Sequence, residues 1–446
     1  MSLQSSRREF LKTATFTGIS VVIANKAWGQ GNKAANDRIN FACIGIDGKG
    51  GSDSEDCKNH GNVVAICDVD SDKLDRAANT RFPNAKKYKD WRKMLDEMGS
   101  GVDAVTVSIP DHMHAVASAS AMQMGHACFT QKPLAHSVWE CRKLAEIART
   151  KKVATQMGNQ GTADGSLRKN AALVRKGVLG VVTEVHVWTN RPIWPQGQDL
   201  PAPKDPPANL DWNLWLGPTA IRPYGDGYCP FSWRGWWDFG TGALGDMACH
   251  TVNLPYMALD LRDPTTIMAE TTGTNKISYP NASTITFQFP ATASRPALTF
   301  VWRDGTKDGK HNHPSQDLLP GMDYQDSGCL IIGTKARMYT PDDYGARAKI
   351  YDSSGKPSAG VDVGEVKYPE SPGHFEEWVR AIKGGEPAVS NFPDYSSHLA
   401  ETILLGNMAV WSPDKKIEWD HRAMRAKNAP EVAHIVKPEL LNGYSI

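Results

Sequence analysis

The chain has 446 residues, of which 40% are hydrophobic and 22% charged, and its formal net charge is +1 at pH 7. A chain of this length normally forms two or three domains with a substantial core. The near-neutral charge excludes a general attraction to nucleic acid or to anionic membrane, so no nucleic-acid partner is expected. These bulk properties predict a soluble globular protein.

The first residues have the layout of an export signal. Arg7 and Arg8 stand in the stretch SSRREFLK, which precedes the uncharged stretch TATFTGISVVIA, and that stretch is too short to span a membrane. We therefore predict a twin-arginine signal peptide over residues 1–29, with AWG at 27–29 as a cleavage site. A basic amphipathic arm and an uncleaved anchor are the alternatives. The signal implies the twin-arginine translocon as a partner and a periplasmic or cell-envelope location.

The eight cysteines do not follow a metal or disulfide pattern. Cys43, Cys67 and Cys128 lie in apolar runs and are expected to be buried, a common environment for free cysteine. No CxxC motif or cysteine–histidine cluster with zinc spacing is present. We expect neither a disulfide scaffold nor a metal site.

From residue 38 onwards, short apolar runs alternate with amphipathic stretches. Ser71 is predicted to cap the helix that carries Leu74 and Ala77. Strands separated by helices predict a parallel sheet covered on both faces, so a doubly wound Rossmann domain is expected over residues 37–160. Its strands are predicted at 39–44, 63–67, 103–110, 126–131 and 153–158.

After a helix at 167–176, β-branched and aromatic residues alternate with polar ones. This pattern predicts an open, mainly antiparallel sheet in an α+β domain over 161–420, used for substrate binding or oligomerisation, with a tail at 421–446. The Pro-rich stretch 196–212 is predicted to be a loop at a functional rim. Strands are predicted at 180–194, 283–290, 297–304 and 328–339, and helices at 374–385 and 398–411.

A glycine turn follows the first predicted strand. Gly45 and Gly50 have the outer spacing of the dinucleotide fingerprint GxGxxG, but Asp47 replaces the middle glycine, and Gly48 and Gly51 are neighbouring glycines. The pattern alone is weak, because glycine-rich turns after strands are common. A carboxylate at position 47 would repel a pyrophosphate unless it points away.

The second strand ends in CDVD, residues 67–70, which places a carboxylate at the ligand edge of the sheet. Asp68 lies at the distance along the chain at which an acidic residue accepts hydrogen bonds from the adenosine ribose. Its charge would repel a 2′-phosphate, so NAD is expected rather than NADP. The alternative is a helix-capping aspartate, a role that Asp70 or Ser71 could fill instead.

Four stretches together resemble the Gfo/Idh/MocA-type oxidoreductases. They are the glycine turn with CDVD, SIPDHMH at 108–114, QKPLAHS at 131–137 and GTGALGDMACHTVN at 240–253. The resemblance covers almost the whole chain after the signal. Exported members resemble NAD-dependent glycosidases and sugar oxidoreductases of cell envelopes. This chain departs from the family pattern at Gln131, where a glutamate is usual, and at Asn253, where an acidic residue is usual.

The resemblance assigns the catalytic roles to Lys132, Asp246 and His250. Asp246 and His250 are four residues apart and would share one helix face. His250 would accept the proton of the substrate hydroxyl, and Asp246 would orient the imidazole of His250 or bind a neighbouring hydroxyl. Lys132 would polarise the substrate oxygen. The alternatives are a structural histidine and a solvated lysine. The residues predicted to bind the cofactor are Gly45, Asp47, Gly48, Lys49, Gly50, Asp68, Ser108, Pro110, His112, His114, Gln131, Lys132, Gln160 and Arg234.

Aromatic residues are dense between residues 188 and 239. Their rings suit a carbohydrate cleft, and a packed core or a homo-oligomer interface is an equally good interpretation. They include Trp188, Trp194, Trp212, Trp215, Tyr224, Trp233, Trp236 and Trp237.

Export bears on the mechanism, because free NAD is scarce outside the cytoplasm and each turnover should restore a retained cofactor. The leading hypothesis is an NAD(H)-dependent oxidoreductase that acts on a carbohydrate or polyol hydroxyl. The alternatives are a glycoside hydrolase that oxidises a sugar transiently and a non-catalytic sugar or cofactor sensor. Asp47 and Gln131 are the residues that favour the sensor.

Overall fold

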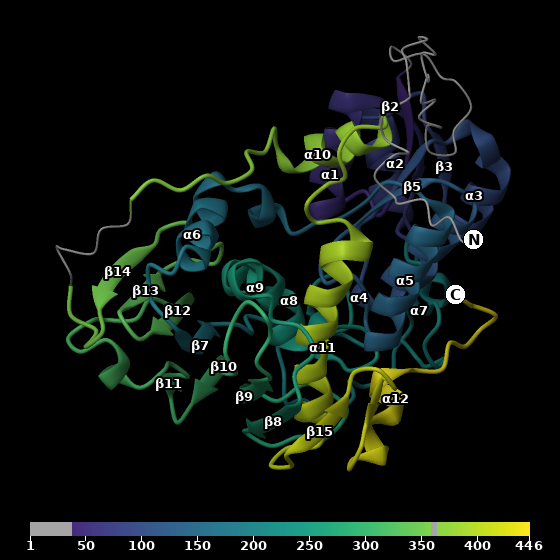
Figure 1. Ribbon diagram of the computed structural model, residues 1–446. Coiled ribbons are helices and arrows are strands. Elements are labelled where there is room, and N and C mark those ends of the chain that lie inside the picture. The colour runs from purple at the N-terminus through teal and green to yellow at the C-terminus, as the bar shows by residue number, and fades with distance from the viewer. Residues whose placement is uncertain (1–37, 358–363) are drawn as a thin grey trace, which may run out of the picture.

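Six parallel strands form the first sheet, in the order β3-β2-β1-β4-β5-β6. The computed structural model describes residues 38–357 and 364–446, so the predicted signal peptide lies outside the described residues. Figure 1 shows this part of the chain in purple and blue beside the second sheet. The strands are β1 (Ile39–Ile44), β2 (Gly61–Cys67), β3 (Lys86–Tyr88), β4 (Ala104–Val107), β5 (Ala127–Thr130) and β6 (Thr155–Met157).

Helices connect these strands as in a doubly wound domain, which confirms the predicted fold. The prediction for the cap of α2 is wrong: Asp70, not Ser71, caps the helix, and its carboxylate accepts the N–H groups of Asp72 and Lys73. Asp70 keeps an extended backbone that aims its side chain at the helix start, while Ser71 is already helical. The helices are α1 (Lys49–His60), α2 (Ser71–Thr80), α3 (Trp91–Met98), α4 (Asp111–Gln123) and α5 (Val138–Lys151).

The second sheet has ten strands in the path β14-β13-β12-β7-β10-β9-β8-β15-β16, with β11 paired to β10. Among the described strands of this sheet only β7 and β10 pair in parallel, so the sheet is mixed but mostly antiparallel. The stretch 328–339, predicted as one strand, is a hairpin of two. The strands are β7 (Val182–Thr189), β8 (Thr266–Thr271), β9 (Ala282–Phe289), β10 (Leu298–Lys307), β11 (Lys310–His311), β12 (Gly328–Gly333), β13 (Ala336–Thr340), β14 (Lys349–Asp352), β15 (Ile417–Asp420) and β16 (Arg425–Ala426).

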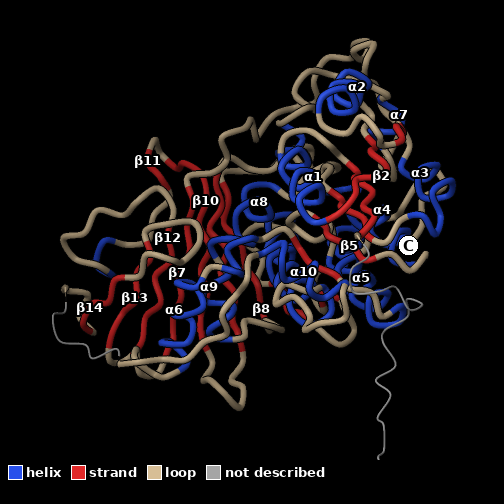
Figure 2. The backbone as a smooth tube through the Cα atoms, turned by 90° about the horizontal axis from the view of Figure 1, so that it is seen from above, coloured by secondary structure: helices blue, strands red, loops and turns tan. Residues whose placement is uncertain are grey.

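The later helices join the two sheets. Figure 2 shows the two groups of strands with helices between them, and α11 contacts both α5 and α8. Helix α10 returns to the first sheet, where Trp378 packs against Phe41 and Phe129, with ring centroids 5.8 and 5.6 Å apart. These helices are α6 (Gly165–Arg175), α7 (Trp212–Leu216), α8 (Gly242–Thr251), α9 (Asn253–Leu259), α10 (His374–Ile382), α11 (Ser397–Trp411) and α12 (Ala433–Val436).

Most cysteines are small buried side chains. Cys43, Cys67 and Cys128 are buried, as predicted, and all eight cysteines are unpaired. No helix within residues 38–357 and 364–446 has the length and apolarity needed to cross a bilayer. The same residues contain no group of three histidine, cysteine or acidic side chains placed to hold a metal ion.

Candidate active site

The glycine turn brings α1 close to the end of β1. Gly45 has a φ of +79°, and a Cβ there would lie 2.2 Å from the carbonyl oxygen of Ser108. A Cβ at Gly50 would lie 2.2 Å from the carbonyl oxygen of Gly45. Only glycine fits these two positions, and no acidic side chain stands in the first turn of α1. The turn therefore fits a pyrophosphate held at the helix N-terminus.

Asp68 fastens the glycine turn to the end of β2. Its carboxylate accepts the N–H of Ile46 at 3.3 Å and the N–H of Asp70 at 3.0 Å. Burial raises the pKa of Asp68, and these two hydrogen bonds oppose the rise. Because Asp70 caps α2, Asp68 is not the capping residue. It lies beside the glycine turn, where a ribose hydroxyl would be bound.

Asp47 is paired with helix α2. Its carboxylate lies 3.4 Å from the Lys73 ammonium and 3.2 Å from the Arg76 guanidinium. Burial tends to raise the pKa of Asp47, but Lys73, the Gly48 N–H and Arg76 bring it below its ordinary value. The negative charge predicted to repel a pyrophosphate is therefore balanced by two cations.

Gln131 binds a buried carboxylate that the sequence analysis missed. Its amide donates to Asp53 at 2.8 Å, and the Ser108 hydroxyl donates to the same oxygen at 2.7 Å. Lys49 donates to the other oxygen. A glutamate at position 131 would place a second carboxylate against Asp53, so this neighbour gives a physical reason for glutamine here. The only available sequence signal was an acidic residue inside a helix after a glycine turn.

Lys132, Asp246 and Arg234 form one charged cluster between the two sheets. The Lys132 ammonium donates to the Asp246 carbonyl oxygen at 2.7 Å and to its carboxylate at 2.8 Å. Arg234, in the 3₁₀ helix Ser232–Gly235, donates to the same carboxylate oxygen at 3.0 Å. Burial alone would raise the pKa of Asp246, but Lys132 and Arg234 lower it to about 2. Asp246 is therefore ionised at neutral pH.

His250 lies one helical turn after Asp246 on α8 and is 7% exposed. Its Nδ1 atom is buried and has no hydrogen-bond partner among the described residues. Burial, followed by the charge of Lys132, lowers the pKa of His250 to about 3. The imidazole is therefore neutral at pH 7 with one ring nitrogen free of a proton, and the same burial and cation make it a weaker base than a solvated histidine.

Tyr344 covers His250 from a loop after β13. The two rings meet edge to face with centroids 5.3 Å apart, and the Tyr344 hydroxyl lies 3.1 Å from the Gln160 amide nitrogen. Asp342 holds the loop by accepting the N–H groups of Tyr344 and Arg347. Tyr344 was missed because its link to α8 is a tertiary contact with no local motif.

The two histidines of SIPDHMH follow Pro110, which precedes α4, and both bind backbone carbonyl groups. His112 lies 3.2 Å from the carbonyl oxygen of Phe239 and 3.0 Å from that of Trp215. The ring of His114 lies 2.7 Å from the carbonyl oxygen of Pro133 and 2.6 Å from that of Ile109. Burial lowers the pKa of His112 to about 3 and that of His114 to about 4. The contacts join α4 to its neighbours, and a role in cofactor binding stays a prediction.

Asn253, the second departure from the family pattern, is fully buried. Its amide nitrogen donates to the Thr162 hydroxyl at 2.8 Å, and its oxygen accepts from the Tyr395 hydroxyl at 2.5 Å. A carboxylate there could accept from the Thr162 and Tyr395 hydroxyls but could not donate as the Asn253 amide does, because it has no donor at neutral pH.

Most of the dense aromatic residues pack into cores. Trp212 and Trp215 stack with centroids 4.8 Å apart, and Trp237 stacks on Tyr279 at 3.8 Å. Trp194 is buried as well, and the Arg234 guanidinium lies 5.8 Å from its ring centroid and 4.3 Å from that of Trp233. Trp212 and Trp215 belong to a buried hydrophobic cluster, which comprises Trp212, Trp215, Leu216, Tyr224, Tyr228, Trp233, Trp236 and Phe239.

Two family models match consecutive parts of the chain. The model of an oxidoreductase family with an NAD-binding Rossmann fold matches residues 39–159. The model of the same family's C-terminal α/β domain matches residues 165–289.

Similar proteins include a curated hydrolase and several solved oxidoreductases. Glycosyl hydrolase family 109 protein 1 of Shewanella sp. (strain MR-4) is 28% identical over 202 residues, which are 39% of this chain and 43% of that protein. The chain spans less than half the length of the curated relatives it matches.

Two solved structures share the fold. The WlbA dehydrogenase of Chromobacterium violaceum, in complex with NADH and UDP-GlcNAcA, has a TM-score of 0.59 at 15% identity, covering 86% of this chain and 97% of that one. The aldose-aldose oxidoreductase of Caulobacter crescentus, complexed with glycerol, has a TM-score of 0.57 at 14% identity, covering 86% of this chain and 100% of that one.

Proposed function

Because the chain belongs to the Gfo/Idh/MocA family of NAD-binding oxidoreductases, we propose that it transfers a hydride between a carbohydrate or polyol carbon and a retained NAD. One observation carries this proposal. Among the described residues, Nδ1 of the buried, neutral His250 has no hydrogen-bond partner, and His250 lies on the same helix as Asp246, which binds Lys132. A proton acceptor and a fixed cation are the two groups that oxidation of a hydroxyl requires.

The side chains divide the work as follows. Asp246 accepts two of the three N–H bonds of Lys132, which leaves one for the substrate oxygen. His250 accepts the hydroxyl proton, and Lys132 stabilises the negative charge that develops on the oxygen. The chemistry that a bound nicotinamide supplies is acceptance of the hydride from the carbon that bears this hydroxyl. Tyr344 shields His250 from water on one side.

We propose NAD rather than NADP as the cofactor. Asp68 is held beside the glycine turn by the N–H groups of Ile46 and Asp70. A carboxylate in that place binds ribose hydroxyls and repels a 2′-phosphate. Titration of nucleotide-free protein should give tighter binding of NAD than of NADP, and Asp68→Ser should narrow the difference. Equal binding of the two by the wild type would contradict this assignment.

A glycoside hydrolase that works through the same transient oxidation is the second candidate, and the family 109 relative favours it. Asp246 is ionised between two cations, so it cannot serve as the acid of an ordinary two-carboxylate glycosidase. The sensor hypothesis loses its support, because Gln131 and Asp47 both have partners that balance them.

The deciding experiment has two steps. Acid-quenched protein is first assayed for copurified NAD or NADH, and we expect one nucleotide per chain. Sugars and glycosides are then screened without added cofactor for oxidised product and for free reducing sugar. Release of reducing sugar without net NADH would assign the hydrolase, while oxidised sugar with NADH would assign the dehydrogenase. Protein that neither contains nor binds nucleotide would overturn both.

Export and assembly are further proposals. We propose that the Arg7-Arg8 signal carries the folded, cofactor-loaded chain to the periplasm or cell envelope and that the mature chain forms a homo-oligomer. Cell fractionation should find the protein outside the cytoplasm, and replacement of both arginines by lysine should retain it inside. Light scattering of the mature protein should give a mass above 48.8 kDa, the mass of one full chain.

A further inference from the structure

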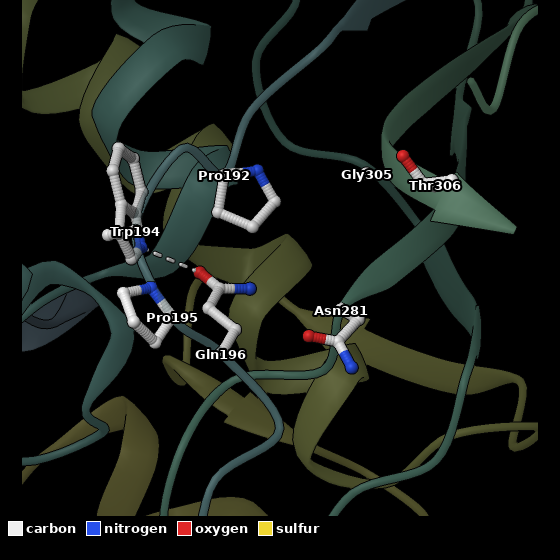
Figure 3. A pocket seen from close by; sticks show the side chains of 7 residues that line it. All are labelled: Pro192, Trp194, Pro195, Gln196, Asn281, Gly305 and Thr306. Carbon is white, nitrogen blue, oxygen red and sulfur yellow. Dashed lines mark hydrogen bonds between the residues drawn. The ribbon is translucent and has the colours of Figure 1, made fainter. Parts of the chain in front are cut away.

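A cavity of about 390 Å³ opens between the segment after β7 and the facing ends of β9 and β10. In Figure 3, Pro192, Trp194 and Pro195 lie on one side of it, and Asn281 and Thr306 lie opposite. Its volume falls in the range of about 300–1,000 Å³ typical of small-ligand sites. Of its lining residues, Trp194 belongs to the aromatic stretch that suits a carbohydrate cleft, and Gln196 begins the Pro-rich stretch predicted to be a loop at a functional rim.

The walls of the cavity are fixed by the protein itself. Gln196 accepts from the Trp194 indole at 3.0 Å and donates to the Pro280 carbonyl oxygen at 2.5 Å. The neighbouring Gly197 N–H donates to the Tyr279 carbonyl oxygen at 2.7 Å. The segment is thereby tied to the chain that leads into β9, so the cavity is pre-formed.

The chemistry of the lining suits a neutral polyhydroxylated ligand. None of the lining side chains is charged. Within the described residues, no hydrogen bond occupies the Asn281 amide or the Thr306 hydroxyl, and both side chains are exposed. Amide and hydroxyl groups pair with sugar hydroxyls, and the apolar rings of Pro192 and Pro195 offer a nonpolar surface to the C–H groups of a sugar ring.

A chain of contacts leads from this cavity to the charged cluster. The Trp194 ring lies 5.8 Å from the Arg234 guanidinium. Arg234 donates to Asp246 at 3.0 Å, and Asp246 accepts from Lys132 at 2.8 Å. We propose that the cavity binds a second, neutral sugar ring of the substrate, joined to the ring that reacts at Lys132. The inference rests on the proposed function and narrows it to substrates of at least two sugar units.

Binding of matched sugars tests this subsite. Calorimetry on the full, nucleotide-loaded protein would compare glucose, galactose and N-acetylglucosamine with cellobiose, lactose and chitobiose. We expect at least one disaccharide to bind at least 10-fold more tightly than its monosaccharide. Asn281→Ala should reduce that advantage by about 3- to 10-fold, the effect of one lost hydrogen bond. Thr306→Trp, which fills the cavity from an exposed strand position, should abolish it.

The controls separate this subsite from the proposed function. Asn62→Ala removes an exposed asparagine from the first sheet and should leave all affinities unchanged. Disaccharides that bind no better than monosaccharides, or variants that weaken both equally, would overturn the subsite. Thr306→Trp that dissociates an oligomer without altering sugar preference would show a subunit contact instead. Oxidation of monosaccharides without tighter disaccharide binding would support the proposed function and reject the subsite. Tighter disaccharide binding without turnover would support the subsite and reject the proposed function.

Discussion

Two acidic residues of this protein each stand beside two cations, but in different surroundings. Asp47, near the glycine turn, has a side chain that is 42% exposed, and Lys73 and Arg76 lower its pKa. Asp246 is 13% exposed, and its two cations bring its pKa to about 2 against a strong effect of burial. Water screens the first arrangement, so it serves mainly to neutralise a surface charge. In the second, exclusion of water makes each charge sensitive to the others, which suits catalysis.

The buried region should give the largest effects, beginning with His250. His250→Ala removes the proposed proton acceptor, and we expect a loss of about 10²–10⁴-fold in kcat. Because burial and then Lys132 lower the pKa of His250 to about 3, the base stays unprotonated above about pH 5. The wild-type kcat/KM should therefore be flat from pH 5 to 8. An acid limb centred near 6.5 would show a solvated imidazole, and His421→Ala, at a histidine whose side chain is 45% exposed, should match the wild type.

Matched substitutions of Lys132 and Lys73 compare the buried and the exposed charge cluster directly. Lys132→Met removes the cation that faces the substrate and should reduce kcat by about 10²–10³-fold, the usual effect of losing one group that stabilises a developing oxyanion. Lys73→Met removes a partner of Asp47 and should change kcat by less than about 3-fold. Steady-state kinetics on both variants, with the nucleotide content measured, would test the contrast. Equal losses would show that the exposed pair also supports turnover.

The sequence predicts those parts of the fold that local pattern controls. The apolar runs located β1 to β6 except the short β3, and the four-residue spacing placed Asp246 and His250 on one helix. The choice of Asp70 over Ser71 as helix cap could not be predicted, because it depends on one residue's backbone angles.

Contacts between distant segments could not be predicted from the sequence for a different reason. Tyr344 reaches His250, and Asp53 reaches Gln131, only after separate elements pack together. Arg234 was predicted to bind the cofactor, and the structure brings it to the Asp246 carboxylate. No periodicity encodes such pairs. The one sequence sign of a pair was Gln131, which stands where the family motif usually carries glutamate and which contacts Asp53.

Gln131→Glu would turn a compensated site into a repulsive one. Its carboxylate would face Asp53, which is 1% exposed, and one of the two groups would have to hold a proton. Repulsion between the two groups raises the folded-state pKa of one carboxyl above its unfolded value. The variant therefore keeps its stability below about pH 4 and loses it as pH rises through the folded-state pKa. We expect a loss of about 2–4 kcal/mol at pH 7, corresponding to a pKa shift of about 1.5–3 units. Urea unfolding at pH 4 and 7 would measure it, with the exposed Gln198→Glu as control. A penalty independent of pH would contradict the mechanism.

Asp47→Asn should give the smallest effect. Its carboxylate is paired with Lys73 and Arg76 and is partly solvated, and exposed ion pairs contribute about 0–1 kcal/mol. NAD affinity should therefore change by less than about 5-fold, which corresponds to about 1 kcal/mol. Titration of nucleotide-free wild type and variant at low and high salt would measure the change. A gain of tenfold or more that disappears at high salt would mean that Asp47 faces the pyrophosphate after all, and that the two cations do not neutralise it.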